Sequence, residues 1–174
     1  MLEGRDGRLG IVESLYEAYK NRVYSLCVKL TGSRSGAEDL FCETWMKIIE
    51  KHRNLKSDKD PANWIYTVCL NLYRKSYAKS KRLPMSARDH ESVLREIHTD
   101  ENLEARVAAS EETAKLRAAI SKLDDKYRVP LILFYFREDS YKDIADVMKL
   151  PMSTVKYRIH RAKKLLRSEM EGES

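Results

Sequence analysis

The side chains best suited to chemistry in this sequence are basic ones near its C-terminal end. From Lys156 to Arg167 the chain carries six Lys or Arg residues and no Asp or Glu. Such a run can bind phosphates, and Lys and Arg can also donate hydrogen bonds to guanine in the major groove of DNA. A solvated basic face near the end of a helix is the alternative, and the charges taken alone favour it.

The spacing of these residues predicts a helix with two distinct faces over 153–170. At about 100° per residue, four apolar residues fall within one sector: Val155, Ile159, Ala162 and Leu166. Ser153 is expected to cap the helix, and Thr154 beside it to meet a phosphate. An apolar back and a hydrogen-bonding front suit a helix that lies in the major groove. The front consists of Lys156, Tyr157, His160, Arg161, Lys164 and Arg167.

A second helix must hold this front in place, and the sequence predicts one over 141–148. Its inward side carries Ile144 and Ala145, and a short segment with Pro151 connects the two helices. Helix, short turn and helix is the geometry of a helix-turn-helix. This arrangement moves the interpretation from a solvated basic face towards a face that binds nucleic acid.

The sequence has no pattern typical of catalysis, of a cofactor or of a metal centre. It contains no glycine-rich phosphate loop and no nucleophile-and-base motif, and its histidines are scattered. The cysteines Cys27, Cys42 and Cys69 are odd in number and lack CxxC spacing, so reduced, packed thiols are expected. A zinc site would need a distant ligand such as His52. We therefore expect no enzymatic activity, cofactor, metal or small-molecule substrate.

Composition and charge predict an all-α chain with two small helical domains. Its 174 residues include only six Gly and four Pro, which favours helices over a turn-rich β fold. Residues 1–83 hold 16 basic and 10 acidic residues, 84–112 hold 3 and 8, and 113–174 hold 14 and 9. Two basic domains thus flank a flexible acidic linker over 84–112, with transient helix around 93–97 and 103–109. No apolar stretch suits a membrane span and no secretory signal opens the chain, so a cytoplasmic protein is expected.

Three helices are expected in the first domain. An apolar stripe predicts the first of them, and Gly32 predicts its end. Ser35 to Glu38 has the spacing of a capping box that would open the second, while Asp60 and Pro61 predict the start of the third. The apolar side of the second helix would comprise Ala37, Leu40, Phe41, Trp45, Ile48 and Ile49. The third would bury Trp64, Ile65, Val68, Cys69 and Leu72.

The second domain is expected to restart near Ser110 and to break after its first helix at Asp124 and Asp125. A further helix is expected to begin at about Pro130, because Pro is tolerated at the start of a helix. The apolar stripe of the first of these helices comprises Leu116, Ile120 and Leu123. The next would carry Leu131, Ile132, Phe134 and Tyr135.

Two parts of the chain carry a resemblance to a known family. Residues 141–167, YKDIADVMKLPMSTVKYRIHRAKKLLR, resemble the promoter-reading helix-turn-helix of the extracytoplasmic-function (ECF) group of sigma-70-like factors. Residues 37–45, AEDLFCETW, resemble the polymerase-binding helix of that group, and residues 64–71 resemble its melting helix. The resemblance implies a sigma-2-like domain and a winged-helix-like sigma-4 domain. It also implies core RNA polymerase, promoter DNA and an anti-sigma factor as partners.

The resemblance alone implies roles for individual residues. Asp39 and Glu43 would contact the largest subunit of the polymerase. The −10 element would be read and melted by Trp64, Asn71, Arg74 and Lys75, although Trp64 equally suits the core. Loop 54–63 would hold a flipped base. The −35 element would meet Ser153, Thr154, Lys156, Tyr157, Arg158, His160, Arg161 and Lys164. Arg158 lies at the edge of the apolar sector and suits a phosphate contact better than a base contact.

Three positions depart from the family's pattern, and a second function stays open. Cys42 stands where Gln is usual, and Lys75 where Asp is common. Lys149 stands where Gly is common, so a left-handed backbone there would carry a small strain. The second function is that of an ordinary helix-turn-helix regulator, dimeric on palindromic half-sites, whose first domain senses a ligand or a partner.

Overall fold

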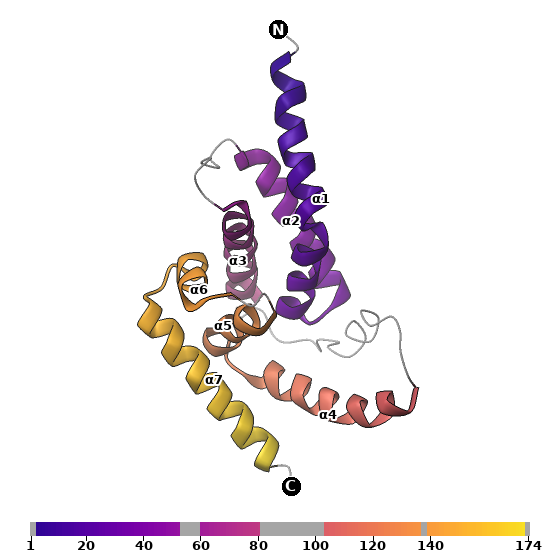
Figure 1. Ribbon diagram of the computed structural model, residues 1–174, viewed down its shortest axis with the longest axis vertical. Helices are drawn as coiled ribbons and strands as arrows, with labels where there is room; N and C mark the ends of the chain where they lie inside the picture. The colour runs from indigo at the N-terminus through magenta and orange to yellow at the C-terminus, as the bar shows by residue number, and fades with distance from the viewer. Residues whose placement is uncertain (1–2, 53–59, 81–102, 137–138, 173–174) are drawn as a thin grey trace. The chain divides into compact units, whose positions relative to one another are not determined.

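The computed structural model describes residues 3–52, 60–80, 103–136 and 139–172, and these form seven α-helices (Figure 1). For these residues the prediction of an all-α chain is confirmed. The chain divides into two compact units, residues 1–95 and 96–174. Each unit buries apolar side chains between its own helices.

The first unit is a bundle of three helices, α1 (Glu3–Thr31), α2 (Arg34–Lys51) and α3 (Pro61–Ser80). Each of these helices packs against the other two. Removing an aliphatic side chain from water stabilises a fold by about 1.5–3 kcal/mol, so this apolar contact is the main source of stability. The fully buried aliphatic side chains include Val23, Leu26, Leu30, Ile48, Ile65 and Leu70.

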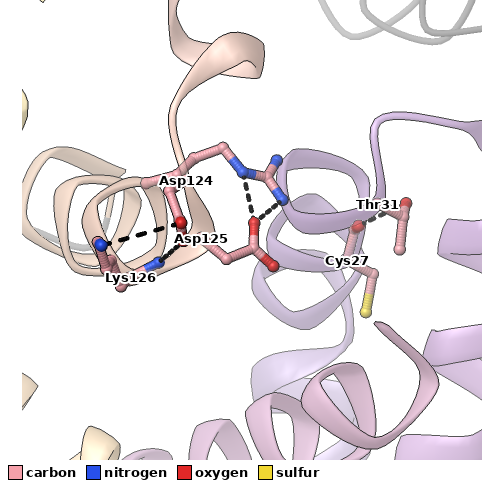
Figure 2. A network of polar contacts seen from close by, with 6 residues as sticks. Cys27, Thr31, Asp124, Asp125 and Lys126 are labelled. Carbon is pink, nitrogen blue, oxygen red and sulfur yellow. Dashed lines mark hydrogen bonds and ion pairs between the residues drawn. The ribbon is translucent and has the colours of Figure 1, made fainter. Parts of the chain in front are cut away.

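The end of α1 is fixed by backbone geometry that the sequence predicts. Gly32 has a φ of 68°, in the left-handed region that glycine adopts without steric cost. Its N–H donates to the carbonyl oxygen of Val28 at 2.8 Å. One residue earlier, the Thr31 hydroxyl donates to the carbonyl oxygen of Cys27 at 2.8 Å (Figure 2). The predicted stop of the first helix at Gly32 is confirmed.

The start of α2 differs from the prediction. Its N-cap is Ser33, whose extended backbone leaves the hydroxyl free to accept from the N–H of Gly36 at 3.2 Å. The capping box predicted at Ser35 is therefore wrong, and Ser35 lies exposed within the first turn. Both serines lie shortly before the apolar residues of α2. The turn at Gly32 places Ser33, and not Ser35, at the N-cap.

The start of α3 agrees with the prediction. A carboxylate oxygen of Asp60 accepts from the N–H of Ala62 at 2.9 Å, and Pro61 is the first helical residue. Pro61 is well placed there because the N–H that it lacks would have no partner within the helix.

The apolar stripe predicted for α3 is only partly right. Ile65 and Cys69 are buried as expected, whereas Trp64, Val68 and Leu72 are half-buried. Tyr66, Leu70 and Tyr73 are also buried.

The second unit contains α4 (Leu103–Lys122), α5 (Asp125–Phe136), α6 (Tyr141–Met148) and α7 (Met152–Gly172). The last of these, α7, packs against the other three. A fully buried set of side chains holds α5, α6 and α7 together: Leu133, Ile144, Val147, Val155 and Ile159. One side of α7 therefore packs against the rest of the second unit, and its other side is exposed to solvent.

The boundaries of α5 correct the prediction of a helix starting at Pro130. Asp124 is the N-cap, and its carboxylate accepts from the N–H of Lys126 at 3.1 Å (Figure 2). The helix begins at Asp125, whose carboxylate also accepts two hydrogen bonds from the Arg128 guanidinium, at 3.0 and 2.7 Å. Pro130 lies inside the helix. It removes only one backbone hydrogen bond, which the buried flanking residues offset.

The first helix of this unit also differs from its prediction. α4 begins at Leu103, inside the segment 84–112 that the sequence predicts as a linker. Residues 84–102 of that segment lie outside the described ranges. Leu116, expected in the apolar stripe, is 38% exposed, and Ala119 is buried in its place.

Candidate nucleic-acid interface

The helix that precedes α7, α6, is short and strongly capped. Ser140 is its N-cap, and its hydroxyl accepts from the N–H of Asp143 at 3.1 Å. The Asp143 carboxylate accepts in return from the N–H of Ser140 at 3.3 Å, which completes a capping box. Such a cap contributes about 1 kcal/mol, which a helix of eight residues needs.

The turn between α6 and α7 depends on one left-handed residue. Lys149 has φ 54° and ψ 49°, and its N–H donates to the carbonyl oxygen of Ala145. The next N–H, of Leu150, donates to the same oxygen at 3.0 Å. The sequence-based expectation of a strained Lys149 agrees with this geometry, because a side chain at positive φ crowds the backbone. Three residues, 149–151, thus connect α6 to α7.

The faces of α7 agree with the predicted ones. Val155, Ile159 and Ala162 are buried, and Leu166 is half-buried. We call the exposed side the reading face, defined by Lys156, Tyr157, His160, Arg161, Lys164 and Arg167. Tyr157 is 62% exposed, although Tyr is often partly buried. The reading face combines cations with side chains that can hydrogen-bond, which is what groove recognition requires.

The start of α7 differs from the prediction. The helix begins at Met152, and the N–H of Val155 donates to the carbonyl oxygen of Pro151 at 3.1 Å. The prediction that Ser153 caps the helix is therefore wrong, and Ser153 lies exposed in the first turn. Thr154 and Arg158 are half-buried. Arg158 projects from the edge opposite Lys156, at about 160° by helical geometry.

A second polar face belongs to α3. Trp64, Asn71 and Lys75 fall within about 40° of one another around the helix, on the side opposite its buried residues. Asn71 and Lys75 are exposed, and Arg74, about 60° from Asn71, is half-buried. This placement favours the surface interpretation of Trp64 over the core interpretation. The predicted base-holding loop 54–63 lies outside the described residues over 54–59.

The exposed side of α2 is acidic and partly apolar. Asp39, Cys42 and Glu43 are all exposed. Beyond them Met46 is 69% exposed and Ile49 is 54% exposed, so the expectation of a buried Ile49 is wrong. The helix keeps its orientation because Leu40, Trp45 and Ile48 are buried on the opposite side. We call Asp39, Cys42, Glu43, Met46 and Ile49 the α2 face.

Sequence reasoning missed the apolar part of the α2 face and also one basic residue on α7. Periodicity alone assigns Ile49 to the core because it is apolar and one residue from Ile48. Lys163 has a helical angle about 80° from Val155, next to the apolar sector, and it is not among the residues that the sequence analysis assigns to the front. In the structure Lys163 is exposed.

Two further features of the described part of the chain bear on membrane and metal binding. None of the helices found there combines the length and the hydrophobicity that a bilayer span requires. Among the same residues, no three His, Cys, Asp or Glu side chains come together in a way that could hold a metal ion. Cys27 and Cys69 are buried, whereas Cys42 is exposed on α2.

A capped helix, a left-handed turn and a second helix with an exposed basic face define a helix-turn-helix protein. Comparison with known proteins narrows this class. Residues 15–83 match the family described as Sigma-70 region 2, and residues 113–166 match Sigma-70, region 4. The ECF RNA polymerase sigma factor SigW of Bacillus subtilis is 27% identical over 162 residues, covering 90% of this chain and 87% of that protein.

Solved structures agree at the level of the fold. The sigma factor RpoE of Bartonella quintana, crystallised with the anti-sigma factor NepR, has a TM-score of 0.71 at 19% identity, covering 91% of this chain and 96% of that one. CnrH, solved with the cytosolic domain of CnrY, has a TM-score of 0.66 at 18% identity, covering 94% and 89%.

The chain belongs to the ECF group of the sigma-70 family. It is an RNA polymerase sigma factor, which works with core RNA polymerase in promoter-directed transcription initiation and catalyses no reaction itself. Matches to region 2 and region 4, in this order along one chain, favour this assignment over a ligand-sensing regulator.

Proposed function

We propose that the reading face of α7 recognises the −35 element of the promoter in the major groove. The observation that carries this proposal is the division of α7 into a buried apolar back and an exposed front without acidic residues. A helix fits the major groove, and bidentate Arg or Lys contacts to guanine each give about 1–3 kcal/mol of discrimination. Arg161 and Lys164, about 60° apart on the front, are the strongest candidates for contacts to DNA. Thr154 and Arg158 would contact phosphates, together with Ser153.

The exposed face of α3 would contact the −10 element during melting. Asn71 offers an amide that can donate to or accept from a base edge, and Lys75 and Arg74 offer charge for the backbone. Trp64 would provide a surface on which an unpaired base stacks, a contact worth about 1–3 kcal/mol per base. Because Lys75 replaces a common Asp, this face is more basic than the family pattern and would hold the backbone more tightly.

The α2 face would dock on the largest subunit of the polymerase. Asp39 and Glu43 lie about one turn apart, and both side chains are exposed. Charge pairs of this kind govern the association rate and partner choice, and the adjoining Met46 and Ile49 add apolar area. Cys42, in place of Gln, removes an amide from the centre of this contact.

A transcription experiment tests the reading face. Arg161→Ala and Lys164→Ala are compared with Lys115→Ala, an exposed lysine on α4, in transcription from a library randomised at the −35 element. We expect the first two variants to relax base preference or to weaken promoter binding, while Lys115→Ala preserves both. An unchanged −35 preference and unchanged affinity in both reading-face variants would contradict the proposal.

The polymerase contact is tested by reversing charge. Asp39→Lys with Glu43→Lys should lower the affinity for core polymerase at least tenfold, because like charges would then meet across the contact. Glu13→Lys, at an exposed position on α1 in the same unit, is the matched control. Equal affinities for the double variant and for the control, with unchanged helix content, would remove Asp39 and Glu43 from the contact.

We further propose that an anti-sigma factor regulates this chain in the cytoplasm. Two solved structures that are similar in fold each contain a second protein: RpoE is bound to the anti-sigma factor NepR, and CnrH is bound to the cytosolic domain of CnrY. Exposed Met46 and Ile49 on the α2 face would suit a partner that competes with the polymerase.

A further inference from the structure

A group of three aromatic rings borders the reading face along α5 and α6. The ring of Phe134 stacks on that of Tyr141, with centroids 5.2 Å apart and an interplanar angle of 18°. It also meets the ring of Tyr135 edge-on, at 5.1 Å between centroids. Tyr135 is 60% exposed, and the other two are half-buried. We call Phe134, Tyr135 and Tyr141 the aromatic shelf.

Two lysines of α7 lie over this shelf. The ammonium of Lys156 is 5.7 Å from the ring centroid of Tyr141. That of Lys163 is 5.0 Å from the centroid of Phe134 and 5.1 Å from that of Tyr135. The two lysines are seven residues apart, so they lie on the same edge of α7, about 10.5 Å apart along its axis. Both are exposed, and each keeps N–H donors available to a ligand in solution.

The cation–π contacts favour phosphate binding by the two lysines. A cation over an aromatic face is stabilised without losing its charge, and the contact restrains a long, flexible side chain. A lysine restrained in this way loses less rotamer entropy when it contacts a phosphate. The edge that carries both lysines adjoins a front with no acidic residue between 156 and 167, so a polyanion is the complementary ligand.

We propose that the aromatic shelf positions Lys156 and Lys163 as a two-point clamp on the phosphate backbone that borders the groove occupied by α7. The clamp rests on the proposed function, because it requires α7 to lie in the groove of the −35 element. Lys163 thereby becomes a DNA-contacting residue. Phe134 and Tyr141 are positioning residues that act through the two lysines and read no base.

The clamp is tested in the holoenzyme, assembled from core polymerase and the full chain, on a promoter duplex that the unaltered holoenzyme selects. Binding is measured over a range of salt concentrations. Lys163→Met should reduce the magnitude of the log–log salt slope by about 0.9 and leave the preferred −35 bases unchanged. Lys115→Met removes one exposed charge from α4 and should leave the slope as it is. An unchanged slope for Lys163→Met overturns the clamp.

The positioning role is tested through Tyr141. Tyr141→Phe keeps the ring and should bind like the parent protein, whereas Tyr141→Leu should weaken binding about two- to fivefold, as expected for one exposed cation–π contact. In a Lys156→Met background, Tyr141→Leu should have no further effect. Equal losses from Tyr141→Leu in both backgrounds overturn the positioning role. Should Tyr141→Leu fail to fold, Lys163→Met, which changes only a surface side chain, still decides the clamp.

A further variant separates failure of the clamp from failure of the proposed function. Lys164→Met alters the reading face away from the shelf. A smaller salt slope for Lys164→Met, together with an unchanged slope for Lys163→Met, overturns the clamp alone. If neither variant changes the slope or the −35 preference, the proposed role of α7 is overturned and the clamp with it.

Discussion

The thiols of Cys27 on α1 and Cys69 on α3 face each other in the core of the first unit, with their sulfur atoms 3.8 Å apart. Both side chains are fully buried, and no disulfide joins them. The hydrogen bond with Cys69, together with burial, raises the pKa of the Cys27 thiol well above its ordinary value. A thiol that stays protonated and buried is a poor nucleophile, so this pair serves packing.

Thiol reactivity should therefore distinguish the three cysteines. In the native protein a thiol reagent should label only Cys42, which is exposed on the α2 face. Cys42→Ser should reduce native labelling to nearly zero, while urea should expose the remaining two thiols in either protein. Mass spectrometry of the labelled protein gives the count. Rapid native labelling of two or three sites would show that the α1–α3 contact opens far more readily than this packing allows.

The same thiol predicts how stability changes with pH. The raised pKa keeps Cys27 protonated in the folded chain, whereas the unfolded chain loses that proton above the ordinary value of 9.0. Above that pH the folded state binds more protons than the unfolded state, so the free energy of unfolding falls as pH rises. The fall attributable to one group is at most about 1.4 kcal/mol per pH unit.

Urea unfolding from pH 7 to 10.5 measures this effect. Since Lys and Tyr also titrate in that range, the comparison is between the parent protein and Cys27→Ala, whose stability should decline less steeply above pH 9. Below pH 8 the difference between the two proteins should be constant. Parallel curves throughout would mean that the folded chain does not hold the Cys27 proton.

The start of α2 yields a matched pair of serine variants. Ser33→Ala removes the hydroxyl that accepts from the N–H of Gly36 and should lower the free energy of unfolding by about 1 kcal/mol. Ser35→Ala changes an exposed position inside the helix, where Ala is the better helix former, and should be neutral or slightly stabilising. Chemical denaturation compares the two. The reverse order of stability would assign the cap to Ser35.

The left-handed residue in the helix-turn-helix predicts a stabilising substitution. Lys149→Gly should relieve the crowding at φ 54° and raise the free energy of unfolding by about 1 kcal/mol, a shift of a few degrees in the melting transition. Lys115→Gly introduces the same residue at an exposed position within α4 and should lower stability by up to about 1 kcal/mol. Destabilisation by Lys149→Gly would contradict the left-handed turn.

Sequence reasoning succeeded where periodicity carries the information. The two faces of α7 repeat over several turns of one continuous helix, so their assignment needs no knowledge of the rest of the fold. The end of α1 at Gly32 and the start of α3 at Pro61 follow from backbone restrictions that belong to those residue types.

Predictions from sequence were wrong where two neighbouring residues could each start a helix. They also missed contacts between residues far apart in the chain. Ser33 and Ser35 are both residue types that favour an N-cap. Likewise, α5 starts after Asp124 and not at Pro130, because the Asp124 carboxylate accepts from a backbone N–H at the start of the helix. Its apolar residue type alone assigns Ile49 to the core, although its side chain is exposed. The aromatic shelf joins Phe134 and Tyr141 to Lys163, and no local pattern in the sequence connects α5 with α7.

We propose that two helical units of one chain direct core RNA polymerase to promoters, with α7 reading the −35 element. The most direct measurement mixes the full chain with core polymerase and a promoter pool, then maps transcript starts and footprints. We predict co-elution with the polymerase and initiation at sites that share one asymmetric upstream element, whose selection changes in Arg161→Ala or Lys164→Ala. A chain that neither co-elutes with polymerase nor initiates RNA from any site in the pool would contradict the account.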